Sequence, residues 1–300
     1  MTEILELDDV RKSYDGHVAV AGVTFSVPAG SIFGLLGPNG AGKTTTIRMI
    51  LDILAPDSGS VRMFGRPRQE ADLGRVGYLP EERGLYRKMT VLDQLLFLAE
   101  IRGIKRRAAL AEIEPWLERA DLGPWAKRRI EELSKGMQQK VQLIGTVLHQ
   151  PELLILDEPF SGLDPLNQEL FRELLTEYRD RGRSVVLSTH GLELAERMCD
   201  RICLISKGRA VLSGELAAIK AGFGGNAYLM TAEGDLDRLR EIPGVEQLAI
   251  TGRTARILLA KETQGADLLV RTVQFLRVSD FRSEEPSLEQ IFLQVVRDET

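Results

Sequence analysis

The stretch GPNGAGKTTT, from Gly37 to Thr46, constrains the fold more than any other part of the chain. It follows the apolar segment SIFGLL and runs into IRMILDIL, which is compatible with a helix. The spacing G-x-x-x-x-G-K-T is typical of a loop that binds phosphate between a β-strand and a helix. Glycines let backbone amides surround an anion, and the helix N-terminus adds unpaired N–H donors and the positive end of its dipole. We therefore predict a strand–loop–helix unit that binds a nucleoside triphosphate.

The residues of this loop have separate expected roles. Lys43 is predicted to reach the β- and γ-phosphates of ATP and to assist catalysis, and the Thr44 hydroxyl is predicted to bind Mg²⁺. The other nucleotide contacts are assigned to the loop positions Gly37, Asn39, Gly40, Ala41, Gly42 and Thr45. A glycine-rich turn before an ordinary helix is the alternative, and the order of strand, loop and helix argues against it.

The segment LLILDEP places two carboxylates, Asp157 and Glu158, after a run of apolar residues. At the carboxyl end of a buried strand, Asp157 can hold Mg²⁺ through water, and Glu158 can polarise an attacking water. An Asp-Glu pair by itself is often only the turn that ends a strand. A phosphate loop alone would also allow a kinase or a GTPase, but together with this pair it predicts Mg²⁺-dependent hydrolysis of the bound nucleoside triphosphate.

Six motifs in a fixed order carry a resemblance to a known family: GPNGAGKT, YLPEE, LSKGM, LLILDEP, SGLD and STH. Over about the first 220 residues, the chain resembles the ATP-binding subunit of ABC transporters. The resemblance implies that Tyr14 stacks on adenine and that His190 contacts the γ-phosphate. It also implies that Ser134 and Gly136 cap the γ-phosphate of ATP bound to a second subunit, and that Asp164 links the two sites. Judged from the residues alone, Tyr14 is also consistent with an ordinary strand aromatic and His190 with a structural histidine.

Two positions depart from the family's pattern. The signature reads LSKGM, with Lys135 and Met137 where the family has Gly and Gln, although Ser134 and Gly136 remain. In addition, Glu81 stands where the family places a Gln that senses Mg²⁺ and the attacking water. A carboxylate there can bind Mg²⁺ but adds negative charge near the triphosphate. The alternative is a loop carboxylate that faces solvent.

The sequence pattern predicts two domains, residues 1–222 and residues 223–300. We expect the first to be an α/β P-loop NTPase domain of ABC type, with a mixed sheet, an antiparallel β subdomain and a helical insertion at about residues 85–150. LLILDEP and SVVLST are predicted as parallel strands, and RICLISKGRAVLSG as a hairpin. A linker signal at residues 221–226 precedes the predicted order β-α-β-β-α-β and a final helix, which indicates a small α+β domain.

The resemblance implies an ATP-binding and hydrolysing subunit of an ABC transporter. Two copies, or two closely related subunits, would close on ATP and drive a separate transmembrane permease. GYLPEERGLY, LSKGMQQK and PSLEQIF also resemble bacterial exporters of the sodium-extrusion type, so export is the expected direction. A soluble ABC-type ATPase acting on ribosomes or nucleic acid is the alternative. A regulatory ATP-binding module is a third hypothesis, and the intact Lys43, Asp157, Glu158 and His190 argue against it.

Composition narrows these classes further. The formal net charge of −5 gives no general attraction to nucleic acid, and the basic clusters at residues 105–107 and 127–129 are typical of solvated helix faces. No run approaches the ~18 apolar residues that span a bilayer, and the acidic start MTEILELDDV does not resemble a signal peptide. We therefore expect a cytoplasmic protein that lies on the inner face of the membrane through its partner. Cys199 and Cys203 are expected to be reduced, half-buried thiols.

The segment from Pro80 to Gly103 is the predicted contact for that membrane partner. It carries Leu85, Tyr86 and Met89 in a loop before a helix, where they have no obvious apolar neighbours in the sequence. The alternative is that these side chains pack inside the helical insertion.

Overall fold

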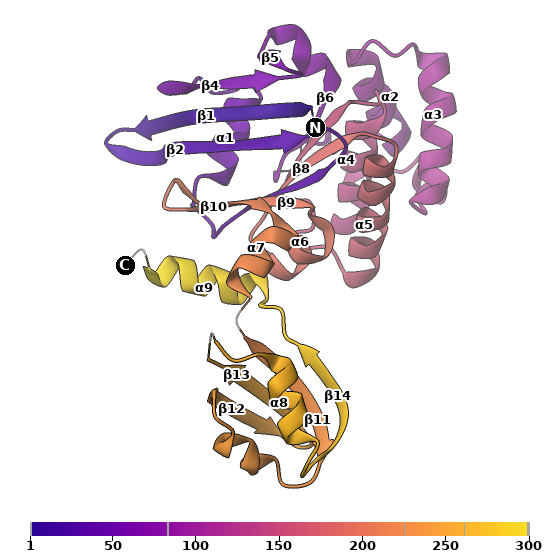
Figure 1. The fold of residues 1–300 in the computed structure, drawn as a ribbon. Coiled ribbons are helices and arrows are strands. Elements are labelled where there is room, and N and C mark those ends of the chain that lie inside the picture. Colours follow the sequence, from indigo (N-terminus) through magenta and orange to yellow (C-terminus); the bar gives the residue numbers. More distant parts are fainter. Residues whose placement is uncertain (1, 83, 225, 261, 299–300) are drawn as a thin grey trace. The chain divides into compact units, whose positions relative to one another are not determined.

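The computed structural model describes residues 2–82, 84–224, 226–260 and 262–298 (Figure 1). The chain divides into two compact units, Met1–Glu215 and Leu216–Thr300. This division falls before the predicted boundary at residue 222, because α7 (Leu216–Phe223) continues as a helix through the first residues of the expected linker. Leu216 and Ile219 are buried on one face of α7. Burial of these side chains stabilises the helix, although the nearby glycines predict a linker.

An antiparallel sheet opens the first unit, as predicted. β1 (Glu3–Tyr14) and β2 (His17–Pro28) form a hairpin in which Tyr14 lies opposite His17. Asp15 and Gly16 form the two-residue turn, both with positive φ, which is the conformation that a tight hairpin requires. The order of this sheet is β2-β1-β4-β5. Its remaining strands are β4 (Ser58–Met63) and β5 (Arg66–Pro67).

The central sheet has the order β10-β9-β3-β8-β7-β6. The pairs β6–β7, β7–β8, β8–β3 and β3–β9 are parallel, whereas β10 and β9 form the predicted antiparallel hairpin. The carboxyl ends of parallel strands share one edge of a sheet, so loops from distant parts of the sequence meet there. The strands are β3 (Ile32–Leu36), β6 (Val76–Leu79), β7 (Leu153–Asp157), β8 (Ser184–Thr189), β9 (Arg201–Ser206) and β10 (Arg209–Glu215).

Helices account for the rest of the first unit. The predicted helical insertion is present: α2, α3 and α4 pack together around their own apolar cluster, which includes Leu95, Ile113 and Ile144 (Figure 1). Helices α1, α5 and α6 contact strands of the central sheet. The α-helices are α1 (Lys43–Ile50), α2 (Val91–Ile101), α3 (Arg106–Arg119), α4 (Lys135–Val147), α5 (Pro165–Asp180) and α6 (Leu192–Met198). Short 3-10 turns are η1 (Glu70–Arg75), η2 (Gly123–Trp125) and η3 (Ile130–Glu132).

The second unit contains an antiparallel sheet of order β12-β13-β11-β14 around its own apolar core. The predicted strand order along the chain is found, but the expected helix at residues 235–242 is only a 3-10 segment, η4 (Leu236–Glu241). Pro243 keeps Ile242 in an extended conformation, which ends the helical segment at Glu241. The other elements are β11 (Ala227–Glu233), β12 (Val245–Thr251), β13 (Thr254–Leu259), α8 (Gly265–Thr272), β14 (Arg277–Ser283) and α9 (Leu288–Asp298).

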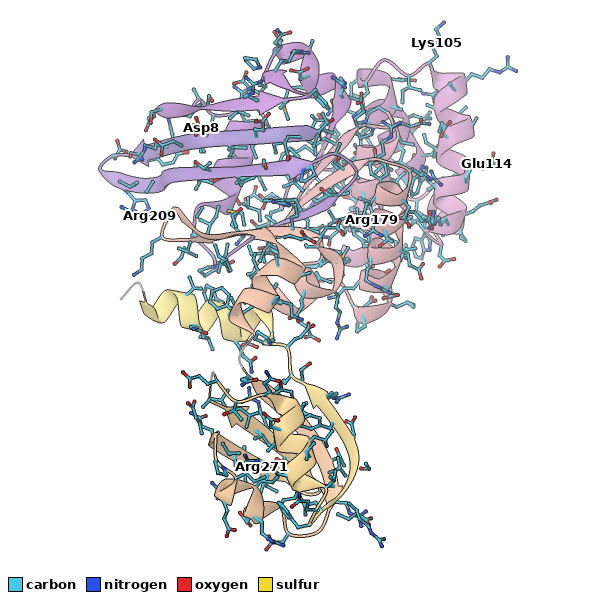
Figure 2. The ribbon with its side chains drawn as sticks, in the orientation of Figure 1. Asp8, Lys105, Glu114, Arg179, Arg209 and Arg271 are labelled. Carbon is cyan, nitrogen blue, oxygen red and sulfur yellow. The ribbon has the colours of Figure 1, made fainter. Side chains whose placement is uncertain are left out.

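The helical insertion carries charged side chains on its surface. Lys105 and Glu114 extend outward from the helical insertion (Figure 2), and the basic clusters there include arginines that form ion pairs with neighbouring glutamates.

Cys199 and Cys203 are free thiols, as expected, but both are fully buried and not half-buried. The reason is that they flank and lie on β9, inside the sheet layer, where burial raises the pKa of Cys203 to about 12. No helix in the described ranges is long and apolar enough to cross a membrane.

Candidate functional site

The phosphate-type loop follows β3 and ends at Gly42, the residue before α1. Gly42 has φ 109°, and a Cβ atom there would lie 2.6 Å from the Ala19 carbonyl oxygen. At Gly37, a Cβ atom would lie 2.2 Å from the Ile205 carbonyl oxygen. Both glycines are therefore required for the loop to fit against β2 and β9. The Ala41 amide donates to Pro38, which closes the loop over the N-terminus of α1.

Lys43 begins α1 and is 6% exposed. Its Nζ donates to the carbonyl oxygen of Gly37 at 2.8 Å and to that of Pro38 at 3.2 Å, so the side chain folds back over the loop. The same Nζ lies 3.5 Å from Oε1 of Glu158, which is 8% exposed. A buried ammonium and a buried carboxylate thus face each other across the mouth of the loop, and each reduces the cost of burying the other.

Glu158 follows β7 and has a positive φ of 48°, an uncommon conformation for a residue with a side chain. Its backbone N–H donates to the carbonyl oxygen of Ser188 at 3.2 Å and to the Ser188 hydroxyl at 3.1 Å. Nδ1 of His190 lies 3.1 Å from both carboxylate oxygens. The backbone of Glu158 is therefore held by β8, and its carboxylate is held between Lys43 and His190.

Asp157 is the last residue of β7 and is 1% exposed. Oδ1 accepts a hydrogen bond from the Ser188 hydroxyl, whereas Oδ2 is buried and has no hydrogen-bond partner among the described residues. Tyr78 on β6 lies close by, and burial together with the charge of Asp157 raises its pKa to about 12, so the phenol stays neutral. Asp157 therefore presents one unsatisfied carboxylate oxygen at the edge of the central sheet.

A cavity of about 510 Å³ lies in front of the loop. It unites eight of the residues predicted from the sequence with two that were not predicted, His17 and Ala19 on β2. The eight are Asn39, Gly40, Gly42, Lys43, Thr44, Thr45, Glu81 and Glu158. No sequence signal singled out His17 and Ala19, because their place in the cavity depends on how the first hairpin packs on the loop. Tyr14 pairs with His17 at the end of that hairpin and is 43% exposed.

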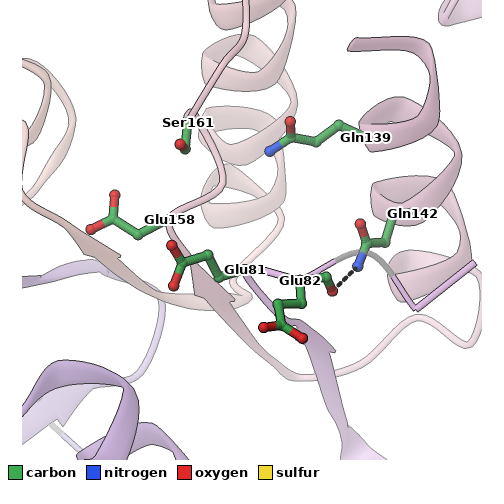
Figure 3. Close-up of a pocket in the computed structure, with 6 residues that line it drawn as sticks. All are labelled: Glu81, Glu82, Gln139, Gln142, Glu158 and Ser161. Carbon is green, nitrogen blue, oxygen red and sulfur yellow. Dashed lines mark hydrogen bonds between the residues drawn. The ribbon is translucent and has the colours of Figure 1, made fainter. Parts of the chain in front are cut away.

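A second cavity of about 370 Å³ adjoins the first and shares Glu81 and Glu158 with it (Figure 3). From α4, the carboxamide of Gln139 donates to the carbonyl oxygen of Pro159 at 2.6 Å, and that of Gln142 donates to the carbonyl oxygen of Glu82 at 3.4 Å. These two bonds join α4 to the residue after Glu158 and to the residue after Glu81, so the helix is tied to the chain next to both carboxylates. The sequence pattern did not single out these glutamines, since they read as one face of a polar helix.

Eight predicted residues are not among those that line the two cavities. Five of them are described above: Tyr14, Gly37, Ala41, Asp157 and His190; the other three are Ser134, Gly136 and Asp164. Ser134 caps α4 and Asp164 caps α5 through their side chains. Asn167 connects the two helix starts, because it donates to Asp164 and its amide nitrogen would lie 3.2 Å from a Cβ at Gly136. Hydrogen bonds from Asn167 lower the pKa of Asp164. Ser134, Gly136, Asp164 and Asn167 therefore form a second group of residues at the N-termini of α4 and α5.

The predicted partner segment is only in part exposed. Leu85 packs against the apolar cluster of the helical insertion, as the alternative expected. Tyr86 is 57% exposed and makes an edge contact with the ring of Phe97, whereas Met89 is half-buried. The Tyr86 amide donates to Gln94 at 2.8 Å, which holds this loop to α2.

The residues at the first cavity fit a nucleoside triphosphate with Mg²⁺. The loop places the N-terminus of α1, with no acidic side chain in its first turn, at the cavity. Oδ2 of Asp157 and the half-buried Thr44 provide oxygen atoms of the kind that Mg²⁺ prefers. Within the described residues, no group of three or more His, Cys, Asp or Glu side chains could hold a metal by itself.

Comparison with known proteins finds a matching family model for each of the two units. A family model described as ABC transporter matches residues 20–161, and one described as ATP-binding protein DrrA1-3-like, C-terminal domain, matches residues 214–296. The chain is 42% identical over 293 residues to the uncharacterized ABC transporter ATP-binding protein YhaQ of Bacillus subtilis, with 98% of each chain covered. It is 39% identical over 276 residues to the Nod factor export ATP-binding protein I of Paraburkholderia xenovorans, covering 88% of this chain and 91% of the relative. A solved structure of the ATP binding subunit of an ABC transporter is 33% identical, with a TM-score of 0.68 over 74% of this chain and 93% of that chain.

Proposed function

The chain belongs to the family of ABC transporter ATP-binding subunits, and we propose that it couples ATP hydrolysis in a two-subunit site to transport by a separate membrane permease. Membership of the family implies ATP binding and ATPase activity. One observation carries the catalytic part of the proposal: the buried Glu158 carboxylate lies 3.5 Å from Lys43 and 3.1 Å from His190 at the mouth of the phosphate loop.

The loop and α1 bind the triphosphate. Backbone amides at the N-terminus of α1 face the phosphates, and Lys43 turns from its carbonyl partners to the β- and γ-phosphate oxygens. Thr44 and Asp157 would hold Mg²⁺, and the bound ion would supply positive charge to neutralise the phosphates. Asn39, Gly40 and the other loop residues set the shape of the cradle, while Tyr14 offers an exposed ring for adenine.

Glu158 acts on the attacking water. Its carboxylate accepts a hydrogen bond from the water and takes its proton as the water approaches phosphorus. His190 contacts both carboxylate oxygens of Glu158 in the free protein, and its proposed role is to donate to the γ-phosphate when ATP binds. Glu81 lines the cavity beside Glu158, where it can reach Mg²⁺ or the water.

A second subunit completes the site. Ser134 and Gly136 lie at the start of α4 and do not line the cavity in front of the loop, which supports a role of their helix N-terminus in capping ATP on another copy. Asp164, joined to this group through Asn167, links the two halves. Closure of two such subunits around ATP would supply the force that moves the permease.

Export is the proposed direction, because one relative is named as a Nod factor export ATP-binding protein. The protein is proposed to work in the cytoplasm, on the inner face of the membrane, with Tyr86 and Met89 toward the permease. None of the relatives reported above is named as acting on ribosomes or nucleic acid, so the soluble alternative gains no support.

Purification of the tagged chain from membranes of its own host tests this function. A multi-span membrane protein should copurify in detergent, and its reconstitution with the chain should give ATP-dependent transport and a higher ATPase rate. ATPase activity with no membrane partner, in a protein found only with ribosomes, would contradict the transport proposal.

A further inference from the structure

Ser188 on β8 is the first residue of the STH segment, in which only His190 has an expected role, and its hydroxyl is hydrogen-bonded to both Asp157 and Glu158. We propose that Ser188 is a positioning residue that fixes the Asp157 carboxylate so that a single oxygen faces the Mg²⁺ position. This inference rests on the proposed ATPase function. It adds to that function a hydroxyl group whose contribution acts through Asp157 and not through contact with nucleotide.

Strand register brings the three residues together. Asp157 at the end of β7 pairs with Ser188 on the parallel strand β8. Ser188 is fully buried and Asp157 is 1% exposed. In such surroundings, hydrogen bonds are not exchanged with solvent, so the direction of each one is determined by its neighbours.

The Ser188 hydroxyl has one proton, and it donates that proton to Oδ1 of Asp157. Its oxygen accepts from the backbone N–H of Glu158 at 3.1 Å. With both sides of the hydroxyl engaged, Oδ1 is occupied and the carboxylate cannot turn freely. Oδ2 is the remaining oxygen, buried and without a partner in the described ranges. An unpaired buried carboxylate oxygen is costly unless a ligand uses it, and Mg²⁺ or its bound water is such a ligand.

Loss of the hydroxyl would affect Asp157 more than Glu158. The Glu158 N–H also donates to the Ser188 carbonyl oxygen at 3.2 Å, and that bond is made by the backbone and survives any substitution. Asp157, in contrast, has no second hydrogen bond from the described residues to hold it. Removal of the hydroxyl should therefore weaken Mg²⁺ binding first. The phosphate loop, to which the Ser188 side chain makes no hydrogen bond among the described residues, should keep its affinity for metal-free ATP.

The test compares Ser188→Ala with Ser184→Ala. Ser184 lies on the same strand, is equally buried and accepts a hydrogen bond from Gly30, but belongs to the other end of β8. ATP affinity is measured by calorimetry with Mg²⁺ and with EDTA, alongside the steady-state turnover at saturating ATP over a range of Mg²⁺ concentrations. In Ser188→Ala we expect the Mg²⁺ affinity of the ATP complex to fall about 10- to 100-fold, as is typical for loss of a residue that orients a metal ligand. Affinity for ATP in EDTA should remain at the parental level, and Ser184→Ala should match the parent in both.

Rescue distinguishes positioning from general packing. Ser188→Thr restores a hydroxyl and should recover most of the Mg²⁺ affinity, whereas Ser188→Cys, of similar size but a weak donor, should not. If Ser188→Ala does not fold, the Cys and Thr variants carry the same comparison. Unchanged Mg²⁺ affinity in the Ala or Cys variant, or an equal loss in metal-free ATP affinity, would overturn the proposal for Ser188. Failure of the parental protein to bind ATP would instead overturn the proposed function.

Discussion

Replacement of Glu158 by Gln removes one negative charge from a site where the charge is enclosed. Glu158 is 8% exposed and lies between Lys43 and His190, and its backbone is held by two bonds to Ser188. The amide has nearly the same shape as the carboxylate, so the positive φ and the backbone bonds should persist. The perturbation is therefore chemical: a poor base replaces a good one.

The substitution has two expected effects, one on the rate of hydrolysis and one on the binding of ATP. Loss of a general base typically costs about 10²- to 10⁴-fold in rate, which corresponds to about 2.7–5.5 kcal/mol of transition-state stabilisation. In the free protein, the substitution also leaves the Lys43 ammonium without its carboxylate, although the bonds to Gly37 and Pro38 remain. Bound triphosphate supplies new negative charge to Lys43, so ATP should stabilise Glu158→Gln at least as much as the parent.

Two measurements check this prediction. Turnover at saturating Mg²⁺-ATP should fall to between about 1% and 0.01% of the parental rate, and the rise in Tm on adding ATP should be equal or larger. Glu82→Gln is the matched control, because Glu82 is an exposed carboxylate that lines only the neighbouring cavity. Parental turnover in Glu158→Gln would refute the assignment of the base, and a lost ATP shift would show that the carboxylate serves to bind nucleotide.

Four other outcomes are expected. ATPase activity should rise more than linearly with protein concentration and be lost in Ser134→Ala, because a second subunit supplies that helix N-terminus; linear dependence would refute the shared site. Glu81→Gln should remain active while ATP-driven dimerisation depends less steeply on Mg²⁺, since an amide binds the metal less strongly and does not repel phosphate; superimposable titrations of parent and variant would show that Glu81 faces only solvent. Tyr86→Glu and Met89→Glu should keep basal ATPase activity but lose copurification of the permease, and full assembly would exclude this surface. Burial lowers the pKa of His149 below the unfolded value of about 6.5, so folding stability is full above that pH and falls as the pH drops through it; His149→Gln should show a smaller loss in urea unfolding between pH 7.5 and 5.5.

The sequence predicted correctly those elements whose structure depends on residues that are adjacent in the chain. The phosphate loop could be recognised because its glycines, its lysine and the following helix are adjacent in the chain, and the structure gives Gly37 and Gly42 a steric reason. The antiparallel hairpin of β1 and β2 followed from alternation and a turn signal. The expected linker start differs in α7, because packing of its buried face extends the helix to Phe223. The expected helix at residues 235–242 is only a 3-10 segment, and there a local signal, Pro243, was not taken into account.

The active-site partners that the sequence did not reveal share one property: each depends on the register of strands or helices that are distant in the sequence. Ser188 is one hydroxyl in an apolar strand until the pairing of β7 with β8 sets it beside Asp157. Gln139 is one polar residue in a helix until α4 meets the carbonyl of Pro159. Such residues are needed because a motif supplies reactive groups but does not fix their rotamers. The groups that hold a carboxylate in one orientation must come from neighbouring elements, and in a parallel sheet those elements lie far apart along the chain.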